Sequence, residues 1–148
     1  MKPFHASIFL ALMLLFVKTT HAAQIQLSGN DPNLVAVEFS GEIKPADFDA
    51  LRRLIEPRLS TNNSFRWFLL NSNGGDVATA MKIGRYIRTL DFDTSVASNA
   101  HCLSSCVFIF AAGNNRRTSK NNLGIHRPFR TSVGSVSRED ATKNYREM

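Results

Sequence analysis

The sequence predicts an α/β fold with a largely parallel sheet and flanking helices, and three observations lead to this prediction. Apolar stretches with strand character alternate with stretches whose apolar residues recur every three or four positions. Short polar or glycine-containing turns separate them, and no internal repeat or low-complexity tract interrupts the order. Strands that alternate with helices form parallel sheets, because each helix returns the chain to the start of the next strand.

Composition indicates one ordinary globular domain. The chain has 148 residues, of which 43% are hydrophobic and 20% charged. Its formal net charge is +6, but the basic residues are scattered and no run exceeds two. Nucleic-acid binding is therefore not expected, because such proteins concentrate their basic residues in a patch or stripe.

The first 22 residues resemble a secretory signal peptide. Lys2 gives a positive start, Ile8–Val17 is an uncharged apolar run, and small residues precede a cut after Ala22. The run is short for a bilayer span of about 20 residues, although an uncleaved membrane anchor is the alternative. We therefore expect segment 1–22 to be a signal peptide, 23–148 to be one domain, and the protein to be exported, either periplasmic or secreted.

The predicted elements of the first half begin with a strand at Leu34–Phe39. A helix follows from Pro45, with apolar residues at three- and four-residue spacing, and Pro57 ends it. The near-continuous apolar stretch Phe65–Leu70 predicts a strand that is buried on both faces.

In the second half, Asp76 begins a predicted helix in which Gly84 lies on the apolar face and permits a close neighbour. A short strand at Thr94–Ala97 comes next, and four more predicted segments follow it. These are an apolar helix at Cys102–Ala112, a basic loop at Asn114–Asn122, a short strand at Leu123–Ile125, and a polar helix from Arg138 in which the chain stops.

Two strand-to-helix turns carry the residue types of a catalytic site, since ligands of parallel sheets bind where strands give way to helices. Gly74-Gly75 allows positive φ and close approach, so nearby backbone N–H groups can face an anion. An ordinary tight turn is the alternative. Ser104-Ser105 lies at the start of the apolar stretch Cys106–Ala112 of the predicted helix, where a serine is either a helix cap or a nucleophile. His126 ends a strand, where it is either structural or a general base.

The two cysteines lie on either side of Ser104. Cys102 and Cys106 have the spacing of residues about 6 Å apart on a helix, which falls within disulfide range. Two buried thiols and a disulfide are both compatible with the sequence, and export favours the disulfide. A metal site is not expected, because no second cysteine pair accompanies these two.

Three motifs together resemble the proteolytic subunit of the Clp protease. Leu70-Asn71-Ser72-Asn73-Gly74-Gly75 is similar to the family's N-S-P-G-G turn. Ser104–Gly113 is similar to the stretch from the catalytic serine to an Ala-Gly helix end, and Gly124–Pro128 is similar to the family's I-H-Q-P. The motifs occur in family order over roughly residues 34–128, and the separation of Gly75 from Ser104 matches that of the family.

The resemblance implies a crotonase-type fold of repeated ββα units and a serine peptidase chemistry without cofactor. Ser104 would be the nucleophile and His126 the general base. The N–H groups of Gly75 and Ser105 would form the oxyanion hole, and Gly74 would support the turn. Family relatives assemble into rings, which implies a homo-oligomer. An ATP-dependent unfoldase partner is not expected outside the cytoplasm.

The sequence departs from the family pattern after His126. The family's third catalytic residue is an aspartate well beyond the histidine, whereas the only acids here are Glu139, Asp140 and Glu147. A Ser/His dyad, an inactive protein and a C-terminally truncated chain all fit this departure. We therefore expect an exported serine peptidase-type hydrolase that acts on peptides or proteins, and the alternative is an inactive module of the same fold that binds peptides or partner subunits.

Overall fold

The computed structural model describes residues 23–59 and 65–126. The expected signal peptide, residues 60–64 and the segment from Arg127 onward, which includes the polar helix expected from Arg138, lie outside the described residues. The described elements follow one another as β1 (Gln24–Ser28), β2 (Leu34–Ser40), α1 (Asp47–Ile55), the 3-10 turn η1 (Glu56–Arg58), β3 (Phe65–Asn71), α2 (Val77–Thr89), β4 (Asp93–Val96), β5 (Cys102–Leu103), α3 (Cys106–Ala111), β6 (Arg116–Thr118) and β7 (Leu123–Gly124).

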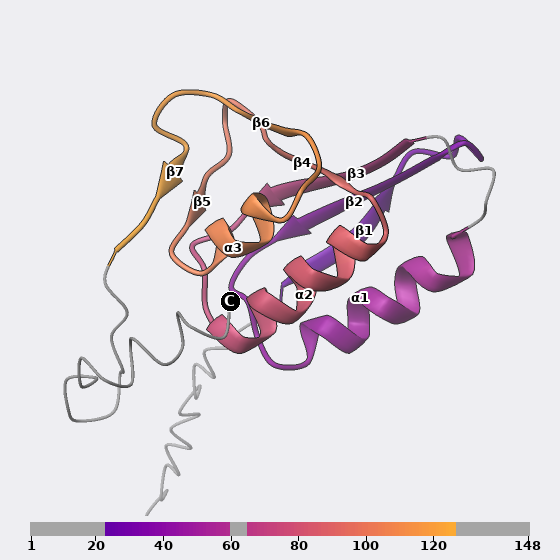
Figure 1. Cartoon of the computed structure of the whole chain (residues 1–148), viewed down its shortest axis with the longest axis horizontal. Coiled ribbons are helices and arrows are strands. Elements are labelled where there is room, and N and C mark those ends of the chain that lie inside the picture. The colour runs from indigo at the N-terminus through magenta and orange to yellow at the C-terminus, as the bar shows by residue number, and fades with distance from the viewer. Residues whose placement is uncertain (1–22, 60–64, 127–148) are drawn as a thin grey trace, which may run out of the picture.

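The prediction of an α/β fold with a largely parallel sheet is confirmed. Five strands form the main sheet in the order β1-β2-β3-β4-β6, in which β1 is antiparallel to β2 and the other neighbours are parallel. Strands β5 and β7 form a small parallel pair at one end of it. Helices α1, α2 and α3 lie on the same side of the main sheet (Figure 1), as right-handed crossovers between successive parallel strands require.

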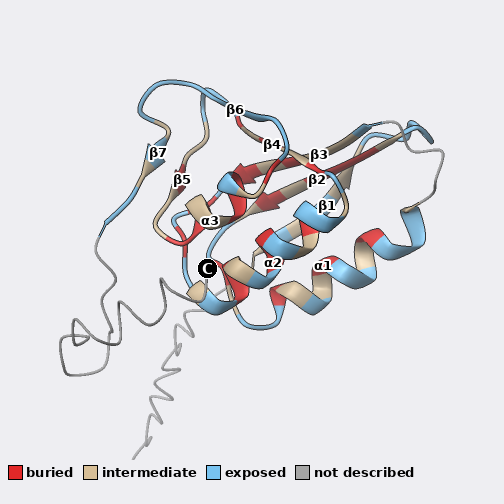
Figure 2. Ribbon diagram, in the orientation of Figure 1, coloured by how far each residue is buried: buried red, intermediate tan, exposed pale blue. Residues whose placement is uncertain are grey.

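The core lies between these helices and one face of the sheet. Figure 2 shows the buried residues along the strands and on the inner sides of the helices. The sheet contributes alternate residues of β2 and β3, and the helices contribute residues at three- and four-residue spacing. The fully buried side chains that meet there include Val37, Phe39, Phe68, Leu51, Ile55, Ile83, Ile87 and Ile109.

Gly84 makes the close helix contact that the sequence predicts. A Cβ atom at this position would lie 3.1 Å from the Phe108 carbonyl oxygen and 3.3 Å from the Ala112 Cβ atom. Helices α2 and α3 therefore approach each other across a residue without a side chain.

Strand β3 departs from its prediction, because only one of its faces is fully buried. Phe68 and Leu70 are enclosed, whereas Phe65 is 62% exposed and Trp67 is partly exposed. Trp67 belongs to the face away from the helices, where the Arg117 guanidinium lies 4.9 Å from its ring centre. The apolar run therefore reflects a buried face combined with an aromatic residue that is covered by a cation.

Two further predictions about elements are corrected, and one strand had not been predicted. The expected helix over Cys102–Ala112 starts only at Cys106, because Cys102–Leu103 pairs with β7 as strand β5. Strand β6 interrupts the expected loop at Asn114–Asn122. Strand β1 was not expected, although Ile25 and Leu27 alternate with polar residues as in a half-buried strand.

No helix among residues 23–59 and 65–126 is long and apolar enough to cross a membrane.

Candidate functional site

The two turns that the sequence singled out lie against each other. The Ser72 N–H donates a hydrogen bond to the His101 carbonyl oxygen at 2.8 Å, and the Leu103 N–H donates to the Ser72 carbonyl oxygen at 2.9 Å. These bonds align the end of β3 with the end of β5. Segments separated by about thirty residues of sequence thus meet at the carboxyl ends of two strands, which is where parallel sheets place their sites.

Gly74 is the point of closest approach between the turns. Its φ is +94°, and a Cβ atom there would lie 2.7 Å from the Ser104 Cβ atom and 2.8 Å from the Leu103 carbonyl oxygen. Both the conformation and the space require glycine. Gly74 therefore allows Ser104 to lie directly on the turn.

Gly75 lies against the backbone of Ile43, in the loop that follows β2. The Ile43 N–H donates to the Gly74 carbonyl oxygen and the Asp76 N–H donates to the Ile43 carbonyl oxygen, both at 2.8 Å. Helix α2 begins immediately afterwards, and the Asp76 carboxylate accepts a hydrogen bond from the Thr79 N–H at 2.7 Å. The predicted strand–turn–helix arrangement around Gly74-Gly75 is confirmed.

Ser104 occupies a sharp turn between β5 and α3. Its φ is +55°, which is uncommon for a residue with a side chain. Its N–H donates to the Gly124 carbonyl oxygen at 2.7 Å, and its carbonyl oxygen accepts from the Val107 N–H at 3.1 Å. A half-buried serine on a strained strand-to-helix turn has the backbone setting of hydrolase nucleophiles, which such turns expose to substrate.

Ser105 is buried and its hydroxyl serves the neighbouring turn. The hydroxyl donates to the Gly75 carbonyl oxygen at 3.1 Å, and α3 has no side-chain cap. The interpretation of a serine here as an ordinary helix cap is therefore wrong. Within the described part of the chain, the backbone N–H groups of Gly75 and Ser105 donate no hydrogen bond, so both remain available to an acceptor.

His126 follows β7, the strand paired with β5. The parallel register sets Leu103 opposite Gly124, so the strand ends that carry Ser104 and His126 run side by side. The histidine is exposed. The acids Glu139, Asp140 and Glu147 lie outside the described residues.

The two cysteines form a disulfide, which decides between the two interpretations of the sequence. Cys102 and Cys106 are joined with their Cα atoms 5.3 Å apart, and both residues are fully buried. The disulfide closes a short ring that contains Ser104. Among the described residues, no group of histidine, cysteine and acidic side chains is suited to hold a metal ion.

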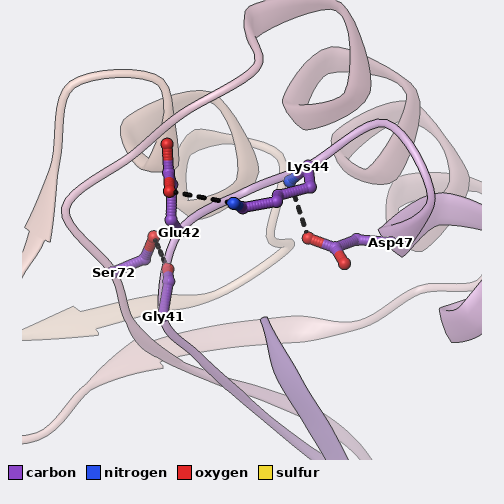
Figure 3. A network of polar contacts seen from close by, with 5 residues as sticks. All are labelled: Gly41, Glu42, Lys44, Asp47 and Ser72. Atoms are coloured by element: carbon purple, nitrogen blue, oxygen red, sulfur yellow. Dashed lines mark hydrogen bonds and ion pairs between the residues drawn. The ribbon is translucent and has the colours of Figure 1, made fainter. Parts of the chain in front are cut away.

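The loop after β2 supports the site, and sequence reasoning missed it. The Ser72 hydroxyl donates to the Gly41 carbonyl oxygen at 2.5 Å (Figure 3). The same hydroxyl accepts a hydrogen bond from the Gly74 N–H at 3.1 Å. Ser72 is buried, so these bonds satisfy a hydroxyl that would otherwise be costly to enclose. Ser72 stands in the turn motif that follows an apolar strand, but nothing in that motif indicates its partner Gly41, which lies 31 positions earlier.

The same loop ends at a buried carboxylate. Asp47 is 2% exposed, and its carboxylate accepts a hydrogen bond from the Lys44 N–H at 2.7 Å. The Lys44 ammonium pairs instead with Glu42 at 3.3 Å (Figure 3). Burial raises the pKa of Asp47, and backbone hydrogen bonds from Lys44 and Ala23 only partly oppose this effect.

Asp47→Asn should therefore change how stability depends on pH. The native state binds a proton more readily than the unfolded chain, whose carboxyl titrates near 3.8, so wild-type stability falls as pH rises through the pKa of the unfolded and then of the folded state. Asparagine keeps an acceptor for the Lys44 N–H and does not ionise. We expect the free energy of unfolding of the variant, relative to wild type, to increase from pH 4 to pH 7. The increase is about 1.4 kcal/mol for each tenfold difference in proton affinity between the folded and unfolded states.

Urea unfolding at several pH values measures this difference. Asp49→Asn is the matched control, because Asp49 is an exposed carboxylate on the same helix. A difference between Asp47→Asn and wild type that stays constant across this pH range would contradict the prediction.

Two arginines of the basic segment 116–120 make contacts that help to hold the fold together. The Arg116 guanidinium donates to the Gly113 carbonyl oxygen at 2.7 Å, near the end of α3. Arg117 lies over Trp67. These two arginines of the segment that was expected to be a basic loop therefore hold β6 against its neighbours.

Neither a protein-family model nor a curated protein sequence matches this chain.

Proposed function

We propose that this chain is an exported serine hydrolase of the peptidase type. One observation carries the proposal: Ser104, in a left-handed backbone conformation, lies against a Gly74-Gly75 turn beside two backbone N–H groups that donate no hydrogen bond in the described part of the chain. A strained serine with unpaired backbone N–H groups on its own turn and on the adjacent turn is suited to acyl transfer.

The proposed reaction begins with attack of the Ser104 hydroxyl oxygen on a peptide carbonyl carbon. His126 accepts the hydroxyl proton and later gives it to the leaving amine. The negative charge on the carbonyl oxygen is stabilised by the N–H groups of Gly75 and Ser105. The resulting acyl-enzyme is then hydrolysed by water, which regenerates the serine hydroxyl.

The supporting contacts favour a site that is rigid before substrate arrives. The Ser105 hydroxyl joins the second turn to the first through the Gly75 carbonyl oxygen, and Ser72 joins the first turn to the loop after β2. The two turns that carry the proposed N–H donors, Gly75 and Ser105, are thus each fixed by a hydrogen bond to another part of the fold. Fixed donors lose little on binding the oxyanion, which is the physical basis of their catalytic effect.

Labelling by a fluorophosphonate tests this function. The probe phosphonylates a serine only where the hydroxyl is activated and the oxyanion is stabilised. We expect the mature protein to be labelled and Ser104→Ala to lose all labelling, while His126→Ala reduces the rate by about 100-fold or more, as loss of a general base does.

Ser119→Ala is the control, because this exposed serine lies outside the proposed site and should leave the labelling rate unchanged. Absence of labelling in folded wild-type protein would contradict the proposal. That result would favour the second function expected from the sequence, a non-catalytic module that binds peptides or partner subunits at the same turns.

A further inference from the structure

The backbone conformation of Ser104 needs support from its surroundings. A serine with φ of +55° has its Cβ atom close to the following carbonyl group, so the free chain seldom adopts this conformation. Helix α3, which begins two residues later, has six residues and is too short to be stable by itself. The turn is therefore held by contacts to other elements and by the Cys102–Cys106 disulfide.

The disulfide joins the two elements between which Ser104 lies. Cys102 is the first residue of β5, and its N–H donates to the Asn122 carbonyl oxygen at 2.8 Å. Cys106 is the first residue of α3. The covalent bond thus fixes the start of a short helix to a strand that is itself held by β7, with Cα atoms 5.3 Å apart.

The proposed site tolerates little movement of the disulfide-closed ring that contains Ser104. Ser104 lies so close to Gly74 that the space has no room for a methyl group. A displacement of about 1 Å would separate the serine from the proposed donors, and misplacement of that size can reduce a rate by about 100-fold. The remaining restraints at the turn are single hydrogen bonds, such as that from the Ser104 N–H to the Gly124 carbonyl oxygen.

We propose that the Cys102–Cys106 disulfide is a redox-dependent positioning device that assembles the site only in an oxidising compartment. This inference rests on the proposed role of Ser104 as a nucleophile. With both sulfurs as thiols, the turn relaxes and the chain is inactive; oxidation joins the sulfurs and sets Ser104 against Gly74. An exported hydrolase of this kind is silent while it is still in a reducing compartment.

The switching step is an ordinary thiol–disulfide exchange. A dithiol reductant transfers two electrons and two protons to the sulfurs of Cys102 and Cys106 and becomes a cyclic disulfide itself. Both cysteines are fully buried, so exchange requires local opening of β5 and α3. Reduction should accordingly be slow compared with that of an exposed disulfide.

A redox titration of the mature protein tests the device. Samples are equilibrated with dithiothreitol at graded ratios of its reduced and oxidised forms, and the disulfide fraction is measured by thiol alkylation and mass spectrometry. We expect the fluorophosphonate labelling rate to fall by about 100-fold on full reduction, with the same midpoint as the disulfide fraction. Far-ultraviolet circular dichroism should keep its sheet and helix signal.

The variant Cys102→Ala/Cys106→Ala provides the matched control. It should label as slowly as the reduced wild type, and dithiothreitol should have no further effect on it. Equal labelling of oxidised and reduced wild type would overturn the proposal. Loss of the circular dichroism signal on reduction would also overturn it, because the disulfide would then stabilise the whole fold rather than position one turn.

Hydrogen exchange separates this inference from the proposed function. The amides of Leu103 and Ser104 are protected by hydrogen bonds to Ser72 and Gly124, and we expect their exchange to accelerate at least tenfold on reduction while β2 and β3 amides stay protected. If oxidised protein is not labelled, the function fails, but faster exchange at these two amides still supports positioning by the disulfide. Unchanged exchange overturns it.

Discussion

Gly75→Ala should unfold a large fraction of the protein, with a loss of more than about 4 kcal/mol in the free energy of unfolding. Gly75 has φ of +143°, a region that residues with a side chain rarely adopt. A Cβ atom there would also overlap the Ile43 carbonyl oxygen and lie 2.8 Å from the Ile43 nitrogen. Both obstacles are backbone atoms, so no side-chain rotation can relieve the clash.

Gly29→Ala separates the two causes. Gly29 also has a positive φ, at +82°, but nothing lies within 4 Å of a Cβ atom there. Its substitution should therefore cost only the conformational strain, about 1–2 kcal/mol. Chemical denaturation of the three proteins measures the difference, and equal losses in the two variants would show that the close approach of Ile43 has no energetic weight.

Any Gly75→Ala protein that still folds should also lose reactivity. The shift needed to accommodate the methyl group moves the Gly74-Gly75 backbone away from Ile43 and so disturbs the close contact between Gly74 and Ser104. Fluorophosphonate labelling of this variant under conditions where circular dichroism shows a folded protein should be at least 100-fold slower than in wild type. Gly29 lies between β1 and β2, outside the proposed site, so Gly29→Ala should be labelled at the wild-type rate.

Phe68→Ala should produce the second large effect, a loss of about 3–5 kcal/mol. Phe68 is fully buried at the centre of the sheet, and its ring packs 6.2 Å from the Phe39 ring and 6.1 Å from the Phe92 ring, measured between centroids. Removal of the ring leaves a cavity between β2, β3 and the chain before β4. Phe39 belongs to β2, and the Phe92 backbone is held by hydrogen bonds to Ile87 and Asn114, so neither ring can move to fill the cavity.

Phe65→Ala is a matched control on the same strand. The Phe65 side chain is 62% exposed, so its removal should change stability by less than about 0.5 kcal/mol. Urea unfolding of both variants provides the comparison. A similar loss for the two would mean that the strand is not buried on the helix-facing side as described.

Local patterns in the sequence were sufficient to predict the order of the main elements. The apolar pattern of 34–39 and 65–70 predicted β2 and β3, and Asp76 with the following three- and four-residue spacing predicted α2. These patterns are local consequences of periods 2 and 3.6, so they can be read without knowing the partner. Their alternation was enough to predict a parallel sheet with helices, and the resemblance of three motifs pointed to Ser104, His126 and the glycine turn.

The ambiguous segments were decided by pairing. The apolar run at Cys102–Ala112 was predicted as a helix from its lack of a polar face. Its first two residues, Cys102 and Leu103, form strand β5 instead because they pair with β7. Short strands such as β6 carry little local preference, so their conformation depends on the hydrogen bonds of a neighbour. The same pairing gives Ser104 its left-handed turn, which a purely helical segment would not contain.

The contacts that hold the candidate site together became visible only in the folded chain. The contacts of Ser72 with Gly41, of Ser105 with Gly75 and of Gly75 with Ile43 join residues about 30 positions apart. No local pattern encodes such contacts, because their energies arise from packing between elements rather than from preferences within one. The sequence supplied the residues that chemistry requires, and the close approach of two turns at the end of a parallel sheet supplied their arrangement.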